Sequence, residues 1–209
     1  MGLSTSIQED PTEFNKQFFY DIESANPSTN DFSELMSGHV LYTTTCLRCM
    51  NDSTREEPFQ ELNFSLESSV EKALHVYSAK ELMTGDHQYQ CDVCARKCDA
   101  ERSVKIKAPK ILQIQLLRYQ YDDNSGKLVK LTPEVIVEDT LVVSGEEFKL
   151  VSVLYHLGNS LNSGHYVCDA LDWYTDEWWH FDDATVRMGT VDVAADAGML
   201  HPLTLITST

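Results

Sequence analysis

The segment SGHYVCDALDWYTDEWWHFDD, residues 163–183, decides how the second half of this chain folds. Its two ends alternate apolar and polar residues, and a polar turn lies between them at residues 173–176, so the segment predicts a β-hairpin. In a hairpin about this turn, His165 and Asp182 lie almost opposite each other. The sequence therefore predicts that a carboxylate holds the imidazole of His165.

An imidazole paired with a carboxylate is what a cysteine or serine protease needs beside its nucleophile. The carboxylate fixes the tautomer of the imidazole, and the imidazole takes the proton of the nucleophile. A histidine at the start of a strand is more often structural than catalytic, so the spacing of His165 and Asp182 leaves both interpretations open. The wider pattern of the chain is needed to choose between them.

Outward from the hairpin, the apolar pattern predicts an α+β fold with helices early and an antiparallel sheet late. Residues 10–24 have apolar side chains every four residues, which is typical of an amphipathic helix. A short helix is expected after Ser68-x-x-Glu71, which resembles a capping box. Partial alternation predicts two strands within residues 40–66. Further strands are expected at residues 104–106, 111–117, 148–156, 164–170, 178–181 and 203–206.

Two C-x-x-C pairs, Cys46 with Cys49 and Cys91 with Cys94, predict a zinc site. Two thiolates three positions apart on a tight turn reach one ion, and two such turns complete a tetrahedron. Four sulfur ligands leave no open position, so the expected zinc is structural. Cys98 follows four residues after Cys94 and is either a substitute ligand or a spare thiol. The alternative is four unrelated core cysteines that share this spacing by chance.

Charge and apolar runs exclude several classes of partner. The 209 residues include 33 acidic and 16 basic side chains, and the formal charge of −17 repels phosphate backbones, so no nucleic acid is expected. A basic partner fits this charge, although solvated carboxylates also simply keep a protein in solution. The apolar runs are far shorter than the roughly 20 residues of a membrane span, so no membrane is expected. Paired cysteines without a secretory signal indicate metal binding and an intracellular protein rather than disulfides.

Four motifs follow one another along the chain. Residues 8–14, QEDPTEF, resemble the Q-Q-D-A-x-E-F box of the ubiquitin-specific proteases, peptidase family C19. The two C-x-x-C pairs resemble the zinc-binding fingers of that family. Residues 109–122 resemble its L-x-L-x-R-F-x-Y-D strand, and residues 155–158, 164–166 and 179–183 resemble its histidine box. Together these motifs cover nearly the whole chain.

The resemblance implies the papain-like cysteine protease fold, with the palm and zinc-binding fingers of these enzymes and most of the thumb missing. It implies a partial catalytic domain over residues 1–209, with a remnant of the thumb helices at 1–37, the fingers and zinc site at 38–108, and the palm with the histidine and aspartate at 109–209. The implied reaction is hydrolysis of the bond after the C-terminal glycine of ubiquitin. The implied partners are ubiquitin and ubiquitinated proteins.

The resemblance also assigns site residues by their match to the motifs. Acidic positions near the N-terminus receive the arginine-bearing tail of ubiquitin in the family, although acids at the start of a helix are also favoured by the helix dipole. Residues beside the histidine line the narrow channel for the terminal glycines. The assigned residues are the general base His165, the orienting Asp182, the supporting Asp183, the tail-binding Asp10 and Glu13, and the channel residues Gly164 and Tyr166.

The nucleophile of the family lies in a G-x-x-N-x-G-N-T-C-Y box, and no part of this sequence matches it. Cys168 is three residues after His165 on the same expected strand, so its side chain is expected on the opposite face, as a core residue. The chain is therefore expected to be inactive alone. It is either a fragment of an active deubiquitinase or a ubiquitin-binding pseudoenzyme or zinc-stabilised interaction module. A freestanding zinc module unrelated to ubiquitin is a third interpretation.

Overall fold

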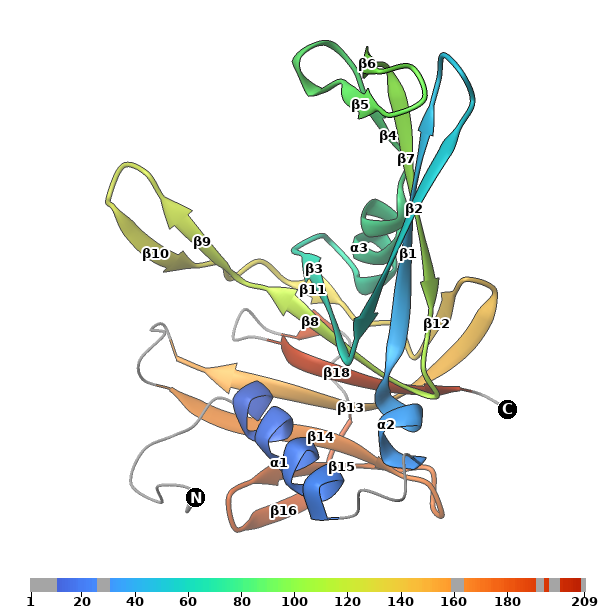
Figure 1. The fold of residues 1–209 in the computed structure, drawn as a ribbon. Coiled ribbons are helices and arrows are strands. Elements are labelled where there is room, and N and C mark those ends of the chain that lie inside the picture. Colours follow the sequence, from blue (N-terminus) through green and yellow to red (C-terminus); the bar gives the residue numbers. More distant parts are fainter. Residues whose placement is uncertain (1–10, 26–30, 159–163, 191–193, 196–199, 208–209) are drawn as a thin grey trace.

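The computed structural model describes residues 11–25, 31–158, 164–190, 194–195 and 200–207 (Figure 1). A large sheet lies at one end of the molecule, and a narrower sheet projects from it. Helices α1 (Pro11–Ala25) and α2 (Asp31–Met36) precede the first strand, and α3 (Val70–Ser78) lies in the angle between the two sheets. Within the described ranges, no helix has the length and apolar character needed to cross a membrane.

The large sheet has eight strands, of which seven follow the order β16-β15-β14-β13-β18-β8-β3. Strand β12 pairs with β13 outside this path, and β3 is parallel to β8 while the other pairs are antiparallel. The strands are β3 (Glu61–Ser65), β8 (Ile111–Leu117), β12 (Thr140–Val143), β13 (Glu146–Leu157), β14 (His165–Asp172), β15 (Glu177–Asp182), β16 (Thr185–Met188) and β18 (Leu200–Thr207).

The projecting sheet is antiparallel and has the order β2-β1-β7-β4. Strand β1 pairs with β2 on one side and with β7 on the other, so the three strands form one long arm (Figure 1). The small β5–β6 sheet lies near the tip of this arm. The elements are β1 (Gly38–Cys46), β2 (Asp52–Phe59), β4 (Glu81–Met83), the 3-10 turn η1 (Gly85–His87), β5 (Tyr89–Cys91), β6 (Arg96–Cys98) and β7 (Ala100–Lys107).

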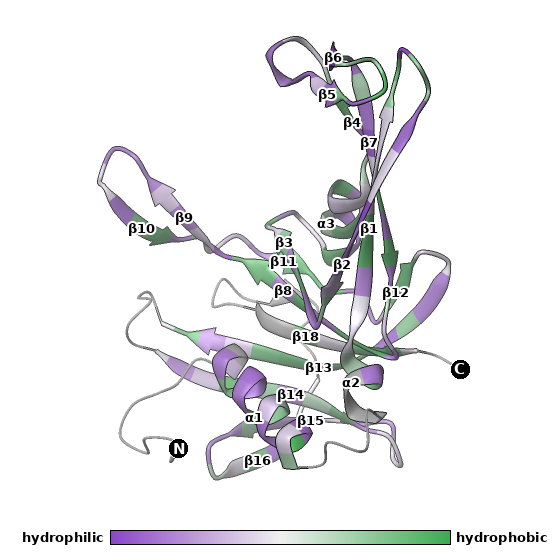
Figure 2. Cartoon of the chain, viewed as in Figure 1, coloured by the Kyte–Doolittle hydropathy of each residue, from purple (hydrophilic) through white to green (hydrophobic). Residues whose placement is uncertain are grey.

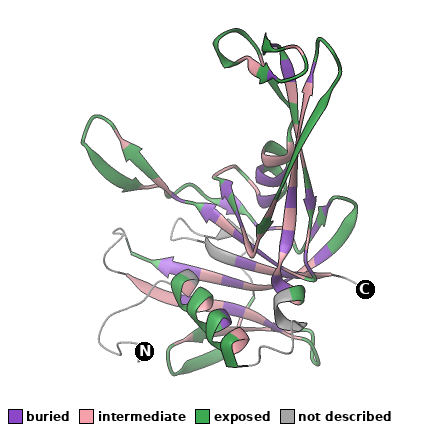
Figure 3. Cartoon of the chain, in the orientation of Figure 1, coloured by how far each residue is buried: buried purple, intermediate pink, exposed green. Residues whose placement is uncertain are grey.

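The hydrophobic core lies where the large sheet meets α3 and the base of the arm. Phe64 on β3 and Phe148 on β13 are completely buried, and burial of such a side chain contributes about 1.5–3 kcal/mol relative to exposure. Buried residues are concentrated on β8 and β13, whereas the β9–β10 hairpin (Tyr119–Asp122 and Lys127–Lys130) is mainly exposed (Figure 3). The core thus fixes the middle of the large sheet and leaves the projecting hairpins to solvent.

Helix α3 joins the two sheets through one apolar side. Hydrophilic and hydrophobic residues alternate along it (Figure 2), and its buried residues are Val70, Ala73 and Leu74. The hydroxyl of Ser69 accepts a hydrogen bond from the N–H of Lys72 at 3.1 Å and caps the helix. The prediction that Ser68 is the cap is therefore wrong by one residue. Ser69 has the extended backbone (φ −151°, ψ 164°) that turns its hydroxyl toward the first turn.

The predicted α+β class and most predicted elements are confirmed. The helix expected at residues 10–24 is α1, and the strands expected from residue 104 onward match β7, β8, β13, β14, β15 and β18. Residues 40–66 form three strands instead of two, because the chain leaves the arm at Gln60 and pairs β3 with β8. The short strands β11 (Val135–Ile136) and β17 (Ala194–Ala195), which pair with each other, were not predicted.

Candidate active site and metal centre

His165 and Asp182 meet at the open end of the β14–β15 hairpin. The register pairs Cys168 with Phe181 and Asp172 with Glu177, which brings the first residue of β14 diagonally across from the last residue of β15. Nε2 of His165 lies 2.6 Å from Oδ1 of Asp182. The proximity predicted from the hairpin pattern is thus present in the structure.

The carboxylates around His165 favour its charged form. The hydrogen bond to Asp182 is the main cause that raises the pKa of His165, and the negative charge of Asp183 adds to it, while desolvation acts in the opposite direction. Asp183 adopts a left-handed backbone (φ 47°), and ligand atoms of all three residues lie within 4.8 Å of one another. Since Nε2 is engaged with Asp182, Nδ1 is the ring nitrogen that can exchange a proton with another group.

Gly164 and Tyr166 flank His165, and His156 packs against both of them. His156 is the Cα partner of Tyr166 in the β13–β14 pair, and the two ring centroids are 4.6 Å apart. A Cβ atom at Gly164 would lie 2.0 Å from Nε2 of His156 and 2.6 Å from the carbonyl oxygen of Leu157. Only glycine therefore fits at position 164 without movement of its neighbours.

Lys130, which no sequence pattern singles out, supports the same region from a different element. Its ammonium on β10 donates hydrogen bonds to the carbonyl oxygens of His156, at 3.5 Å, and of Gly158. Lys130 and His156 are 26 residues apart in the chain. A lysine on an exposed hairpin carries no local signal of such a contact, so only the tertiary structure reveals it.

Cys168 is not part of the His165 cluster. Its thiol donates to the carbonyl oxygen of Asp169 at 3.5 Å, and burial raises the pKa of the thiol to about 11. The β14 register contains no bulge, so residues three apart point to opposite faces of the strand. Cys168 thus lies on the face opposite His165, as expected, but it is half-buried rather than part of the hydrophobic core.

Of the two acidic residues predicted to receive a basic tail, the structure describes only Glu13. Glu13 lies in the first turn of α1 and is exposed. Asp10 lies outside the described residues. The structure thus places one of the two side chains on a solvent-facing helix.

The four cysteines of the C-x-x-C pairs converge at the tip of the arm. Their sulfur atoms all lie within 4.8 Å of one another, and Sγ of Cys49 is 3.7 Å from Sγ of Cys91. Each pair is followed by a non-glycine residue in the left-handed region, Met50 at φ 58° and Ala95 at φ 52°, so both turns reverse the chain in the same way. The four thiols are close enough together to share one metal ion.

The cysteines have unequal affinities for protons. The backbone N–H of Cys49 donates to the sulfur of Cys46 and is the main cause that lowers the pKa of Cys46 to about 7. The sulfur of Cys49 is the main cause that raises the pKa of Cys94. Cys98 is buried beside this group and also raises the pKa of Cys94, but it does not belong to the four-member cluster.

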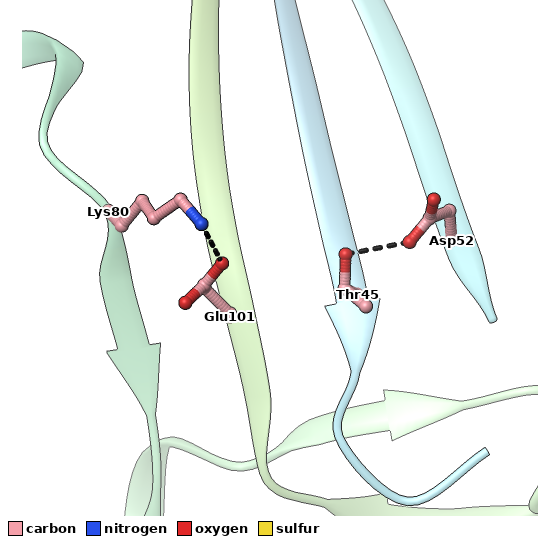
Figure 4. Close-up of polar contacts among 4 residues, drawn as sticks. All are labelled: Thr45, Asp52, Lys80 and Glu101. Carbon is pink, nitrogen blue, oxygen red and sulfur yellow. Dashed lines mark hydrogen bonds and ion pairs between the residues drawn. The ribbon is translucent and has the colours of Figure 1, made fainter. Parts of the chain in front are cut away.

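Two polar contacts brace the arm below the cysteines (Figure 4). Oγ1 of Thr45 donates to Oδ1 of Asp52 at 2.6 Å and links β1 to β2 directly beside Cys46. Nζ of Lys80 lies 2.7 Å from Oε1 of Glu101 and links the start of β4 to β7. Both contacts are exposed and mainly fix local geometry: the Lys80–Glu101 ion pair adds under about 1 kcal/mol, and the Thr45–Asp52 hydrogen bond about 0.5–1.5 kcal/mol.

Known proteins resemble this chain in sequence along nearly its whole length. A family model described as ubiquitin carboxyl-terminal hydrolase matches residues 2–201. Ubiquitin carboxyl-terminal hydrolase 48 of Danio rerio is 30% identical over 204 residues, which are 90% of this chain and 20% of that protein. Ubiquitin carboxyl-terminal hydrolase 26 of Arabidopsis thaliana is 31% identical over 206 residues, 89% of this chain and 19% of that protein. The chain thus spans about a fifth of these relatives.

Solved structures share the fold. A chain in the SAGA Ubp8/Sgf11/Sus1/Sgf73 DUB module bound to ubiquitin aldehyde superposes with a TM-score of 0.82 at 21% identity, over 97% of this chain and 50% of that one. A structure of the same module bound to monoubiquitin gives a TM-score of 0.84 at 22% identity, over 97% and 49%. The predicted protease fold is confirmed by these superpositions.

Proposed function

Because the chain belongs to the ubiquitin carboxyl-terminal hydrolase family, peptidase C19, we propose that it is part of a deubiquitinase domain that cleaves after the C-terminal glycine of ubiquitin by cysteine protease chemistry. The observation that carries this proposal is the 2.6 Å contact between Nε2 of His165 and Oδ1 of Asp182. A carboxylate in this position holds the imidazole in the tautomer that a general base requires.

In the proposed reaction, Nε2–H of His165 donates to Asp182 and Nδ1 takes the proton of a cysteine thiol. The thiolate forms a bond to the carbonyl carbon of the terminal glycine, and His165 then gives the proton to the departing amine. Water hydrolyses the thioester in a second step, in which His165 again removes a proton. Asp183 adds negative charge that stabilises the imidazolium formed in each step.

The nucleophile in this proposal comes from outside the 209 residues. Among the described residues, no cysteine belongs to the cluster around His165, and Cys168 has a half-buried thiol with a raised pKa. The chain alone is therefore proposed to bind ubiquitin without hydrolysing it. A pseudoenzyme that binds ubiquitin is the second candidate, and the same lack of a clustered cysteine favours it.

The proposed binding groove for the ubiquitin tail runs past the open end of the hairpin. Gly164 and Tyr166 line it beside His165, and the ring of His156, tilted by 33° to the ring of Tyr166, supports Tyr166. Exposed Glu13, together with Asp10, provides negative charge for the arginine-bearing tail. The solved structures that share this fold hold ubiquitin aldehyde and monoubiquitin, which supports ubiquitin as the partner.

The metal proposed for the four-cysteine cluster is a structural zinc ion. Zn–S bonds of about 2.3 Å in a tetrahedron place neighbouring sulfurs about 3.8 Å apart, close to the observed 3.7 Å between Cys49 and Cys91. Cys46, Cys49, Cys91 and Cys94 would hold the ion, and four thiolates leave it no position for substrate. Zinc would stabilise the two turns at the tip of the arm.

We further propose the division of the chain that the resemblance implies, for a protein that acts inside the cell. Residues 1–37 correspond to thumb helices, residues 38–108 to the fingers with the metal site, and residues 109–209 to the palm with His165 and Asp182. The separate course of the arm β1, β2 and β7 supports the second boundary.

Titration of isotopically labelled ubiquitin with the zinc-loaded chain tests this function. Resonances of the ubiquitin tail are expected to shift at millimolar concentration, and ubiquitin without its tail is expected to bind much more weakly. The variant Glu13→Gln is expected to weaken binding by about 2- to 5-fold, because an exposed charge pair contributes under about 1 kcal/mol. Absence of any shift would exclude ubiquitin as the partner. No release of fluorophore from a ubiquitin C-terminal amide is expected from the chain alone.

A further inference from the structure

The β14–β15 hairpin contains a second histidine–aspartate pair. Asp169 and His180 are direct Cα partners across the two strands, and Nδ1 of His180 lies 2.6 Å from Oδ1 of Asp169. Only 8% of the Asp169 side chain and 19% of the His180 side chain are exposed, compared with 48% for Asp182 and 35% for His165. The proposed reaction does not use this pair, yet it is the more buried of the two.

Both pairs lie on the same face of the hairpin. Side chains alternate along a strand, so His165, Val167 and Asp169 point to one face of β14, while His180 and Asp182 point to the same face of β15. Val167 is buried between the two acid–base pairs. On β14, Asp169 of this inner pair lies four residues from His165 of the outer pair, and on β15 His180 lies two residues from Asp182.

Register decides whether the outer pair can form. A slip of one residue between β14 and β15 would move every side chain of one strand to the opposite face and would separate His165 from Asp182. A buried carboxylate without its partner is strongly unfavourable, so the inner pair penalises each slipped register. The exposed outer pair lacks such a penalty, because water can solvate its members.

We propose that Asp169 and His180 are positioning residues that fix the register of the hairpin and thereby hold Asp182 within reach of His165. This inference rests on the proposed function of His165 as the general base. The residues of the neighbouring strand leave the hydrogen bond between Asp169 and His180 undisturbed. Arg187 on β16 is the Cα partner of His180, and Gly189 lies so close that a Cβ atom there would be 3.2 Å from Cβ of His180. Neither residue provides a second carboxylate that would compete for His180.

The titration of His165, followed by NMR in the intact chain, tests the proposal without any need for activity. In the variant Asp169→Val/His180→Val, an apolar pair suited to strands replaces the polar one, and His165 is expected to lose its upward pKa shift. The exchanged pair Asp169→His/His180→Asp restores the cross-strand contact and is expected to restore the shift. A purely structural pair would lower the melting temperature of the divaline variant and leave the pKa of His165 unchanged, which would overturn the proposal.

A matched control lies at the other end of the same hairpin. Asp176 in the turn forms an exposed ion pair of 2.7 Å with Lys149, so Asp176→Asn is expected to leave the titration of His165 unchanged. An equal effect of this variant would also overturn the proposal. Should the divaline variant not fold, Asp169→Ser makes the milder test with the same expected loss. Because ubiquitin binding is measured separately, a failure of the proposed function remains distinguishable from a failure of this inference.

Discussion

The imidazole of His156 occupies the space that a side chain at Gly164 would need. Nε2 of His156 is 2.0 Å from the position of a Cβ atom at Gly164, and the carbonyl oxygen of Leu157 is 2.6 Å from it. His156 cannot easily move, because it is buried and its ring packs against the ring of Tyr166. The glycine before His165 is thus required by packing rather than by an unusual backbone angle.

The variant Gly164→Ala is expected to lower the free energy of unfolding by about 1–3 kcal/mol, because the added methyl group forces the buried ring or the strand to shift. It is also expected to weaken ubiquitin binding, since Tyr166 rests on the same ring. Chemical denaturation and the ubiquitin titration measure the two effects. Gly145→Ala is the control: a Cβ atom there meets no atom within 4 Å, and the left-handed backbone (φ 93°) adds about 1–2 kcal/mol of strain far from His156 in the sequence. Equal binding by both variants would contradict the packing argument.

The variant Asp182→Asn is expected to return the pKa of His165 toward the ordinary 6.5, because it removes the main cause of the upward shift. A raised folded-state pKa contributes stability that is fully present below the unfolded value and is lost as the pH rises through the folded value. The stability lost on substitution should therefore be larger at pH 5.5 than at pH 9.

Thermal melts of Asp182→Asn at several pH values, with the NMR titration of His165, check this prediction. Asp183→Asn is the control and is expected to have a smaller effect, because Asp183 acts on His165 through its charge alone. A larger destabilisation at high pH than at low pH would contradict the assigned pair.

The β14–β15 hairpin was predictable because its signals are local. A polar turn, alternation on both sides and a histidine and an aspartate at matching distances from the turn define the register within a few residues. The inner pair of Asp169 and His180 follows the same register, so the alternating pattern of the two strands also predicts that these residues face each other. Attention to the charged residues within the strands, rather than only at their ends, would have found it.

Other parts of the site depend on contacts that no local pattern encodes. Lys130 reaches the carbonyl oxygen of His156 because the last residue of β10, at the base of the hairpin, lies near the end of β13. The two turns that carry the C-x-x-C pairs depend on a left-handed backbone at Met50 and Ala95. Neither residue type predicts this conformation. The C-x-x-C spacing nevertheless predicted the cluster, because the need for four sulfurs around one ion restricts the spacing even where the backbone is unusual.

The chain purified with zinc is expected to contain about one ion per molecule, and Cys91→Ser is expected to lose it. Since metal binding contributes folding free energy, the variant should lose several kcal/mol of stability, most of it from the arm. Elemental analysis and thermal melts measure both quantities. Cys98→Ser is the matched control, because Cys98 is buried beside the cluster but outside its four members. Loss of zinc from Cys98→Ser with retention in Cys94→Ser would show that Cys98 is the fourth ligand instead.

Cys168 is expected to resist modification although it lies on the same strand as His165. With a pKa of about 11, on the order of one thiol in several thousand is ionised at pH 7.5, and the thiolate is the reactive form. A ubiquitin vinyl-sulfone probe should therefore form no adduct with the folded chain, and Cys168→Ser should bind ubiquitin like the unmodified protein. Intact-mass spectrometry measures the adduct, and denatured protein treated with a small alkylating agent confirms that the thiol is free. An adduct on Cys168 in the folded chain would identify it as the nucleophile and would replace the proposal that the nucleophile comes from elsewhere.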